Sequence, residues 1–189
     1  ENTIVIFMSD HGEMLGDHGM WSKANFYRQS MHVPCIMRPA PSQVADARLG
    51  WHSPALVQHL DMPVTMLDIA GAHALDDSLG TSLTSYVGMD PDAPEASQGK
   101  DAIISELFGQ STVCTDDYKL TVRIDDHRPQ QLFDLAKDPD ELTNVVREPE
   151  YDDTIRGLIA QHLDPLRGRL NTEQLADYRN YVKTTGQVN

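Results

Sequence analysis

Basic residues are scarce in this sequence, and their scarcity limits the partners that it can bind. Lysine and arginine number 15 against 29 aspartates and glutamates, so the formal net charge is −14 over 189 residues. We therefore expect no nucleic-acid partner, because binding to phosphates needs a basic face. Such a charge also repels anionic substrates at long range, so an anionic substrate would need a local cation, either a metal ion or a placed lysine or arginine.

The sequence also lacks a long hydrophobic run, a targeting signal and a cysteine motif. No apolar run approaches the roughly 20 residues of a membrane helix, so we expect no membrane span. The start, Glu1-Asn2-Thr3, has no initiator methionine and no basic signal-peptide region. We expect a fragment or a processed piece, whose compartment the sequence does not indicate. Cys35 and Cys114 lie outside any C-x-x-C motif; they could pair, but two buried free thiols are expected.

The first hundred residues predict an α/β arrangement. Residues 3–8 form a continuous apolar run rich in β-branched side chains, which is typical of a central strand buried on both faces of a parallel sheet. Further strand segments are predicted over residues 33–38 and 53–60. Asp61 is expected to cap a helix over residues 63–70 that Gly71 ends. Because this helix is apolar nearly all round, we expect it to be buried.

The pattern changes after Lys100, where short apolar segments alternate with Asp-rich turns. Strands are predicted over residues 102–107, 112–114, 119–124 and 131–135. Short strands in series predict a small antiparallel sheet. Apolar residues then recur at helical spacing over residues 151–166, which predicts a helix packed on that sheet, and a shorter helix is expected over residues 172–188.

Polar residues end the first predicted strand abruptly, at the position where α/β folds place ligands. Asp10 offers an anionic oxygen, His11 offers an imidazole nitrogen, and Gly12 lets the backbone bend so that both can face one ion. This mixed pair suits Mn²⁺, Zn²⁺ or Fe²⁺ better than Ca²⁺, which tolerates it. Two ligands cannot hold a metal, so others must come from elsewhere. Taken alone, the pair is more simply an aspartate that caps a turn beside a loop histidine.

Several sequence elements, in order, resemble the C-terminal signature of the sulfatase family in the alkaline-phosphatase-like superfamily. The resemblance covers residues 3–165 and is carried by F-M-S-D-H-G-E-M-L-G-D-H-G-M-W-S-K (residues 7–23), Phe26-Tyr27, His32–Pro34, Asp61–Gly71, Tyr118–Leu120, Gln131–Leu135 and Asp138–Asn144. The element at residues 61–71 departs slightly from the family pattern D-x-x-P-T-x-L-D-x-A-G, at Met62, Pro63 and Val64. Each element is weak alone, but together they are specific.

The resemblance implies a fold and roles for three residues. Residues 1–100 would be the C-terminal part of the α/β catalytic domain and its parallel-type sheet, and residues 101–189 a small α+β subdomain. Asp10 and His11 match metal ligands, with calcium expected from the family and manganese or another divalent ion as alternatives. Lys23, thirteen residues after Asp10, matches the catalytic lysine that contacts the sulfate group; alone, it would be read as a solvated loop lysine.

The family's nucleophile is not found in the sequence. Sulfatases convert the Cys or Ser of a C/S-x-P/A-x-R motif to formylglycine, and neither Cys35 nor Cys114 lies in such a motif. In the family this motif and the first Asp-Asp metal pair precede the region that is matched here. We therefore expect roughly the last two-fifths of an enzyme, inactive by itself, with the N-terminal remainder of the same polypeptide as its partner.

The remaining candidates are weaker. Glu13, Asp17 and His18 could support the site or simply face solvent, and His32 is expected to be structural. The other histidines and the Asp pairs at residues 76–77, 116–117, 125–126 and 152–153 are also expected to be structural.

The sequence leaves three functions open. The first is an arylsulfatase-like hydrolase of an anionic small-molecule or saccharide sulfate ester. The second is a phosphonate or phosphate ester hydrolase of the same superfamily, and the third is a non-catalytic C-terminal module.

Overall fold

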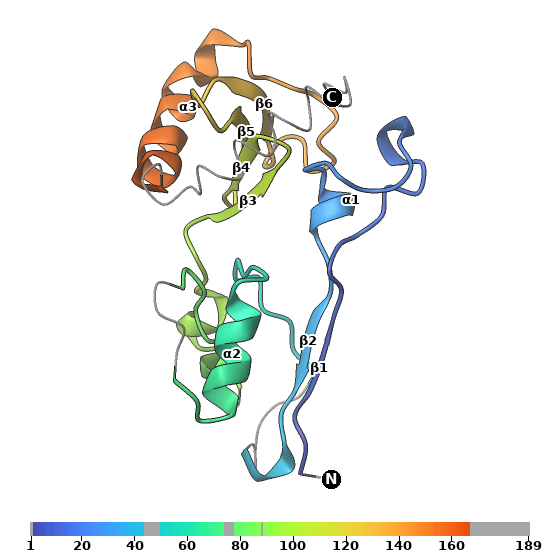
Figure 1. Ribbon diagram of the computed structural model, residues 1–189, viewed down its shortest axis with the longest axis vertical. Coiled ribbons are helices and arrows are strands. Elements are labelled where there is room, and N and C mark those ends of the chain that lie inside the picture. Colours follow the sequence, from blue (N-terminus) through green and yellow to red (C-terminus); the bar gives the residue numbers. More distant parts are fainter. Residues whose placement is uncertain (1, 44–49, 74–77, 88, 167–189) are drawn as a thin grey trace. The chain divides into compact units, whose positions relative to one another are not determined.

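The computed structural model describes residues 2–43, 50–73, 78–87 and 89–166. The chain divides into two compact units, drawn with their helices and strands in Figure 1. The first comprises Glu1–Lys23 and Gln29–Ile103, and the second comprises Ala24–Arg28 and Ile104–Asn189. Within the described ranges, no helix combines the length and the apolar character that crossing a membrane requires.

The described residues of the first unit contain a two-stranded ribbon and two helices. Strand β1 (Val5–Met8) pairs antiparallel with β2 (Cys35–Arg38), with Phe7 opposite Ile36. Helix α1 (Arg28–Met31) leads back into this unit, and α2 (Asp61–Ile69) is its longest helix. Short 3-10 turns lie at Asp17–Gly19, Pro41–Gln43, Thr84–Tyr86 and Pro94–Ser97.

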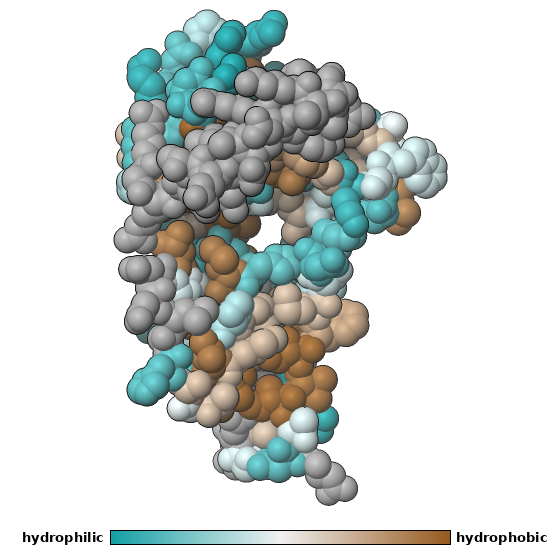
Figure 2. Space-filling model, viewed as in Figure 1, coloured by the Kyte–Doolittle hydropathy of each residue, from teal (hydrophilic) through white to brown (hydrophobic). Residues whose placement is uncertain are grey.

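The prediction that residues 3–8 are a central strand buried on both faces is wrong for the described chain. Side chains of Val5 and Phe7 are 46% and 60% exposed, and Ile36 on the partner strand is 58% exposed. Figure 2 shows hydrophobic residues gathered over this ribbon. An apolar run indicates a strand that needs cover on both faces, but among the described residues β1 has one partner strand, and that strand is antiparallel.

Helix α2 ends as the sequence predicts. Gly71 adopts a left-handed φ of 65°, a conformation that glycine adopts without the steric cost of a side chain. Its N–H donates to the carbonyl of Asp68 at 3.0 Å, and Ala72 donates to Leu67 at 2.9 Å. Met66 is 51% exposed, so the prediction of a fully buried helix is wrong. The strand expected over residues 53–60 does not form.

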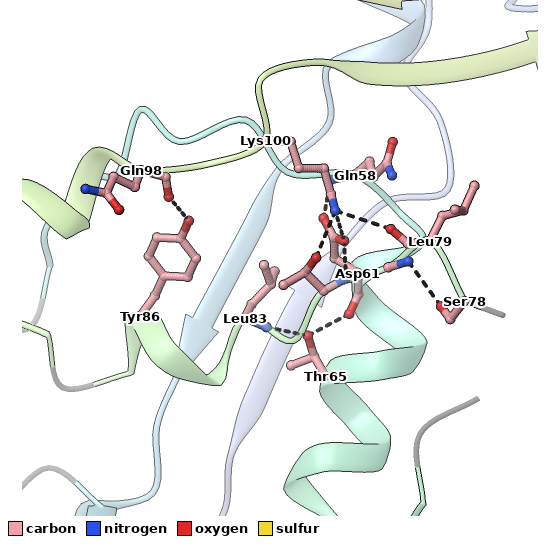
Figure 3. Close-up of polar contacts among 11 residues, drawn as sticks. Gln58, Asp61, Thr65, Ser78, Leu79, Leu83, Tyr86, Gln98 and Lys100 are labelled. Carbon is pink, nitrogen blue, oxygen red and sulfur yellow. Dashed lines mark hydrogen bonds and ion pairs between the residues drawn. The ribbon is translucent and has the colours of Figure 1, made fainter. Parts of the chain in front are cut away.

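Asp61 does not cap α2 from outside; the helix begins at this residue. Its fully buried carboxylate accepts the backbone N–H of Gln58 at 2.8 Å and pairs with the ammonium of Lys100 at 3.0 Å (Figure 3). It also accepts the backbone N–H of Thr81 at 2.7 Å. A buried carboxylate requires such partners, because an unpaired charge in the interior is costly. Asp61 therefore joins three separate segments of the first unit, a role that depends on contacts distant in sequence.

The second unit contains the predicted antiparallel sheet. Its strands are β3 (Ile103–Leu107), β4 (Gln110–Cys114), β5 (Tyr118–Arg123) and β6 (Pro129–Asp134), which lie side by side in that order. The β4–β5 and β5–β6 pairs are antiparallel. Four side chains at the centre of the sheet are fully buried: Val113, Leu120, Val122 and Leu132.

The predicted C-terminal helix also forms, with a change of pitch. A 3-10 turn (Pro149–Tyr151) precedes α3 (Asp152–Leu158), which continues as a π-helical turn (Ile159–Leu163) and a 3-10 turn (Asp164–Leu166). Its apolar side chains Ile155, Leu158 and Leu163 are buried in the core. The short helix predicted over residues 172–188 and the aspartates at 76–77 lie outside the described residues.

The two cysteines are free thiols, as predicted. The prediction that both are buried is wrong, since Cys35 is exposed and Cys114 is half-buried. Cys35 lies on β2 opposite Met8, on the face of the ribbon away from the Phe7–Ile36 pair.

Candidate active site

The loop that follows β1 is held by backbone hydrogen bonds to α1. Gly12 donates its N–H to the carbonyl of Ser30 at 2.8 Å, and Glu13 donates to Gln29 at 3.0 Å. A Cβ atom built on Gly12 would lie 1.9 Å from the carbonyl oxygen of Gln29. Glycine is therefore required at this position for steric reasons, because any side chain would displace α1 from the loop that carries Asp10 and His11.

Replacing Gly12 with alanine should destabilise the intact protein by about 2 kcal/mol, because the new methyl group would meet backbone atoms that cannot rotate away. Denaturant-induced unfolding measures the loss. The control is Gly157→Ala, at an exposed position in α3 with open space around the Cβ, which should stabilise the protein by about 1 kcal/mol through helix propensity. Equal stability of the Gly12→Ala variant and the unaltered protein would contradict the close approach.

The hydrogen bonds of His11 define one tautomer of its ring. Nδ1 lies 2.7 Å from the carbonyl oxygen of Gly12, and Nε2 lies 2.6 Å from Nζ of Lys23. A carbonyl oxygen can only accept and an ammonium can only donate, so Nδ1 carries the hydrogen and Nε2 presents a lone pair. Metal-binding histidines are commonly oriented in this way, by a hydrogen bond from the other ring nitrogen to a backbone carbonyl.

Asp10 brings a second electron-pair donor to the same place. Its Oδ2 lies 3.5 Å from Nε2 of His11, and its Oδ1 accepts the backbone N–H of His11 at 3.0 Å. Partial desolvation opposes ionisation, but electrostatic attraction from the His11 ring, the backbone hydrogen bonds and the charge of Lys23 outweigh it and hold the pKa of Asp10 below its usual value. The carboxylate is therefore ionised at neutral pH.

The donor set of Asp10 and His11 fits a divalent metal ion. Two ligand atoms on one ion, each about 2.0 to 2.6 Å from it, are separated by roughly 3 to 3.5 Å when they meet at near-right angles. The 3.5 Å between Oδ2 of Asp10 and Nε2 of His11 lies at the upper end of this range. The described residues contain no group of three or more His, Cys, Asp or Glu side chains that could hold an ion. By itself the pair would fill only two positions of a coordination sphere.

Lys23 reaches the same point from the far end of the loop. Its Nζ contacts the lone pair of His11, twelve residues earlier, and the residues on either side of it, Ser22 and Ala24, have left-handed φ angles of 72° and 76°. Non-glycine residues adopt this conformation only where the surroundings impose it. The structure therefore brings together all three residues that the sequence singles out: Asp10, His11 and Lys23.

The weaker candidates lie around this group. Asp17 and His18 form the 3-10 turn of the loop, and His32 follows α1. The described hydrogen bonds do not link the side chain of Glu13 or Asp17 to Asp10 or His11. One contact was missed: His59 Nε2 lies 2.8 Å from the carbonyl oxygen of Ser9, beside Asp10. Fifty residues separate this pair, so no local pattern could have indicated it.

Comparison with known proteins gives consistent results for most of the chain. The family model described as "N-sulphoglucosamine sulphohydrolase, C-terminal" matches residues 16–168. Mouse (Mus musculus) arylsulfatase K is 35% identical over 163 residues, which cover 78% of this chain and 28% of that protein. N-acetylglucosamine-6-O-sulfatase of Bacteroides thetaiotaomicron is 28% identical over 162 residues, covering 80% of this chain and 28% of that protein.

The chain is also similar in fold to a solved structure. The phosphonate monoester hydrolase of Agrobacterium radiobacter superposes with a TM-score of 0.72 and 28% identity, over 88% of this chain and 35% of that one. The chain thus spans about a third or less of the length of these relatives. Because the family model covers most of the chain and a relative that is 35% identical covers 78% of it, the chain belongs to the sulfatase family and corresponds to its C-terminal portion.

Proposed function

We propose that the intact protein is a metal-dependent hydrolase of sulfate monoesters. In this proposal Asp10 and His11 are two ligands of a divalent ion, and Lys23 binds the anionic group of the substrate. One observation supports this proposal above all. Oδ2 of Asp10 lies 3.5 Å from Nε2 of His11, and Nζ of Lys23 lies 2.6 Å from the same Nε2. Asp10 and His11 can donate electron pairs to a metal ion, and the ammonium of Lys23 can bind an anionic group beside it. This arrangement suits hydrolysis of an anionic ester.

Each of these residues has a distinct part in the proposed reaction. Asp10, ionised at neutral pH, supplies negative charge for the metal. His11 is oriented by the carbonyl of Gly12 so that Nε2 faces the site. The ammonium of Lys23 neutralises charge that develops on the sulfate oxygens as the ester bond breaks. A bound divalent ion, calcium or alternatively manganese, supplies Lewis-acid polarisation of the ester.

The rest of the proposed site would come from the remainder of the polypeptide, including the formylglycine nucleophile and further metal ligands. The exposed apolar ribbon supports this. Phe7 and Ile36 face each other across β1 and β2 and are both more than half exposed, which is unusual for paired residues of a folded core. We propose that the N-terminal remainder of the chain covers this ribbon and completes the sheet.

The relatives narrow the substrate class. One is named an arylsulfatase and another an N-acetylglucosamine-6-O-sulfatase, so we propose an anionic small-molecule or saccharide sulfate ester. A second candidate, hydrolysis of a phosphonate or phosphate ester, is favoured by the superposition on a phosphonate monoester hydrolase. Asp10, His11 and Lys23 suit both, because each substrate presents an anionic tetrahedral group to a metal and a lysine.

Turnover of matched substrates by the intact protein separates these functions. With metal present, hydrolysis of an aryl sulfate should exceed that of the corresponding aryl phosphonate by at least about tenfold in kcat/KM. Both rates should be lost in a chelator and return when a divalent ion is added back. Faster phosphonate hydrolysis would favour the second candidate. The non-catalytic alternative requires that aryl sulfates, aryl phosphonates and sulfated saccharides all remain unhydrolysed.

A further inference from the structure

Residues 24–28, which follow Lys23 directly, belong to the second unit and are held within it by a buried ion pair. Lys119 on β5 donates from Nζ to the carbonyl oxygen of Phe26 at 3.0 Å, and Glu141 accepts the backbone N–H of Arg28 at its Oε2, also at 3.0 Å. The two side chains are ion-paired with each other and are only 5% and 2% exposed. One pair of opposite charges thus holds one acceptor and one donor of the same short segment.

The residues near the Lys119–Glu141 pair also contact residues 24–28. Lys119 lies opposite Phe133 in the β5–β6 register, and the ring of Tyr27 packs on Phe133 with centroids 5.8 Å apart. Glu141 has a left-handed φ of 58°, which a residue with a side chain adopts only where its contacts enforce it. Burying an ion pair is seldom the most stabilising choice, since apolar residues of similar size pack as well. A role in fixing geometry accounts better for its presence.

The segment matters to the site because of the backbone on both sides of Lys23. Ser22 and Ala24 are both left-handed, so the position of Lys23 depends on two strained residues. On the N-terminal side, the carbonyl of Ser22 accepts the N–H of Met14, a fully buried residue, at 2.9 Å. On the C-terminal side, the chain passes at Ala24 into the segment held by Lys119 and Glu141.

We propose that Lys119 and Glu141 are positioning residues for Lys23, acting through the backbone of residues 26–28. The inference rests on the proposed function only for the role of Lys23. Both residues lie in sequence elements that mark the family resemblance and that the metal and anion chemistry does not use. Without the pair, Ala24 and Ser22 can relax from their left-handed conformations, and Nζ of Lys23 leaves the point where it meets His11.

The first test combines two substitutions in the intact protein. Glu141→Gln removes the charge that pairs with Lys119 and keeps the size of the side chain. It should lower the turnover of an aryl sulfate on the order of 10- to 100-fold through misplacement of Lys23. In a Lys23→Ala background the same substitution should change the rate less than about twofold, because there is no lysine left to position. If the two substitutions lowered the rate independently, so that the double variant showed the product of the two single losses, the proposal would be overturned. Full activity of a folded Glu141→Gln protein would also overturn it.

A second variant protects the test against misfolding. Lys119→Met combined with Glu141→Met removes both charges and leaves no unpaired ion in the core, and it should show the same loss of rate. Tyr151→Phe is the matched control. It deletes a buried hydrogen bond to Asp134 and a half-buried one from Lys137, both at 2.9 Å and in the same unit. No described hydrogen bond joins the Tyr151 side chain to residues 24–28, so the substitution should lower stability and leave kcat unchanged.

Hydrogen exchange on the intact protein without substrate separates this inference from the proposed function. The backbone N–H of Arg28 donates to Glu141 and that of Tyr27 donates to Asn25, and these hydrogen bonds slow the exchange of both amides. A peptide covering residues 24–30 should therefore exchange faster in Glu141→Gln and not in Tyr151→Phe. Unchanged exchange would refute the positioning role whatever the rates. Faster exchange with full activity of Lys23→Ala would show instead that the proposed role of Lys23 in turnover is wrong.

Discussion

Replacing Asp10 with alanine in the intact protein is expected to abolish metal binding and sulfate ester turnover together. The carboxylate is the only charged metal ligand of the proposed pair, and its pKa is held low by the neighbouring His11 and Lys23. Its removal leaves one imidazole nitrogen beside the ammonium of Lys23, an arrangement that repels a cation. We expect metal affinity to fall by at least about 100-fold and turnover to fall on the order of 10³-fold, the effect of losing Lewis-acid stabilisation worth several kcal/mol.

Elemental analysis beside steady-state rates measures both quantities. The control is Asp17→Ala, which removes an exposed carboxylate from the same loop and should change neither by more than about twofold. The comparison separates a ligand from the general negative charge of the loop. An Asp10→Ala protein with full metal content and full activity would refute the assignment of Asp10 and His11.

Replacing Lys23 with alanine is expected to lower turnover by roughly 10²- to 10³-fold, the usual cost of removing one charged contact to the transition state. Metal content should stay the same or rise, because the ammonium lies 2.6 Å from the nitrogen that would bind the metal. An ion and the ammonium cannot both occupy that point, so we expect the side chain of Lys23 to turn toward the substrate when the ion binds.

The control for this substitution is Lys137→Ala, a lysine whose side chain is 71% exposed and paired with Asp134 in the second unit. Its rate should remain within about twofold of the unaltered protein. Near-normal turnover of Lys23→Ala would mean that this residue is a solvated loop lysine. Loss of metal in Lys23→Ala would mean instead that the substitution disturbs the loop itself.

Local patterns predicted the elements of the second unit well. The strands expected over residues 102–135 form as β3 to β6, because short apolar segments between Asp-rich turns offer few alternatives. The stop of α2 at Gly71 was predictable for the same reason, since its left-handed conformation depends on the residue itself.

The predictions that failed depended on distant contacts. Burial of residues 3–8 requires other residues to cover them, and the described residues do not do so. Asp61 was expected to cap α2, but its carboxylate instead binds Gln58, Thr81 and Lys100. Composition shows which residues need cover or partners, but it does not show where these come from.

The sequence by itself determined the alternation of strands and turns after Lys100 and the glycine that ends α2. Through its resemblance to the sulfatases, it also led to the proposal that Asp10, His11 and Lys23 are site residues. These features follow from the conformational preferences and chemistry of the residues themselves. The tertiary structure alone decided the tautomer of His11, the contact of Lys23 with its Nε2, and the attachment of residues 24–28 to the second unit through Lys119 and Glu141. Each of these depends on atoms brought together by folding, and a buried charge takes whichever partner the fold places beside it.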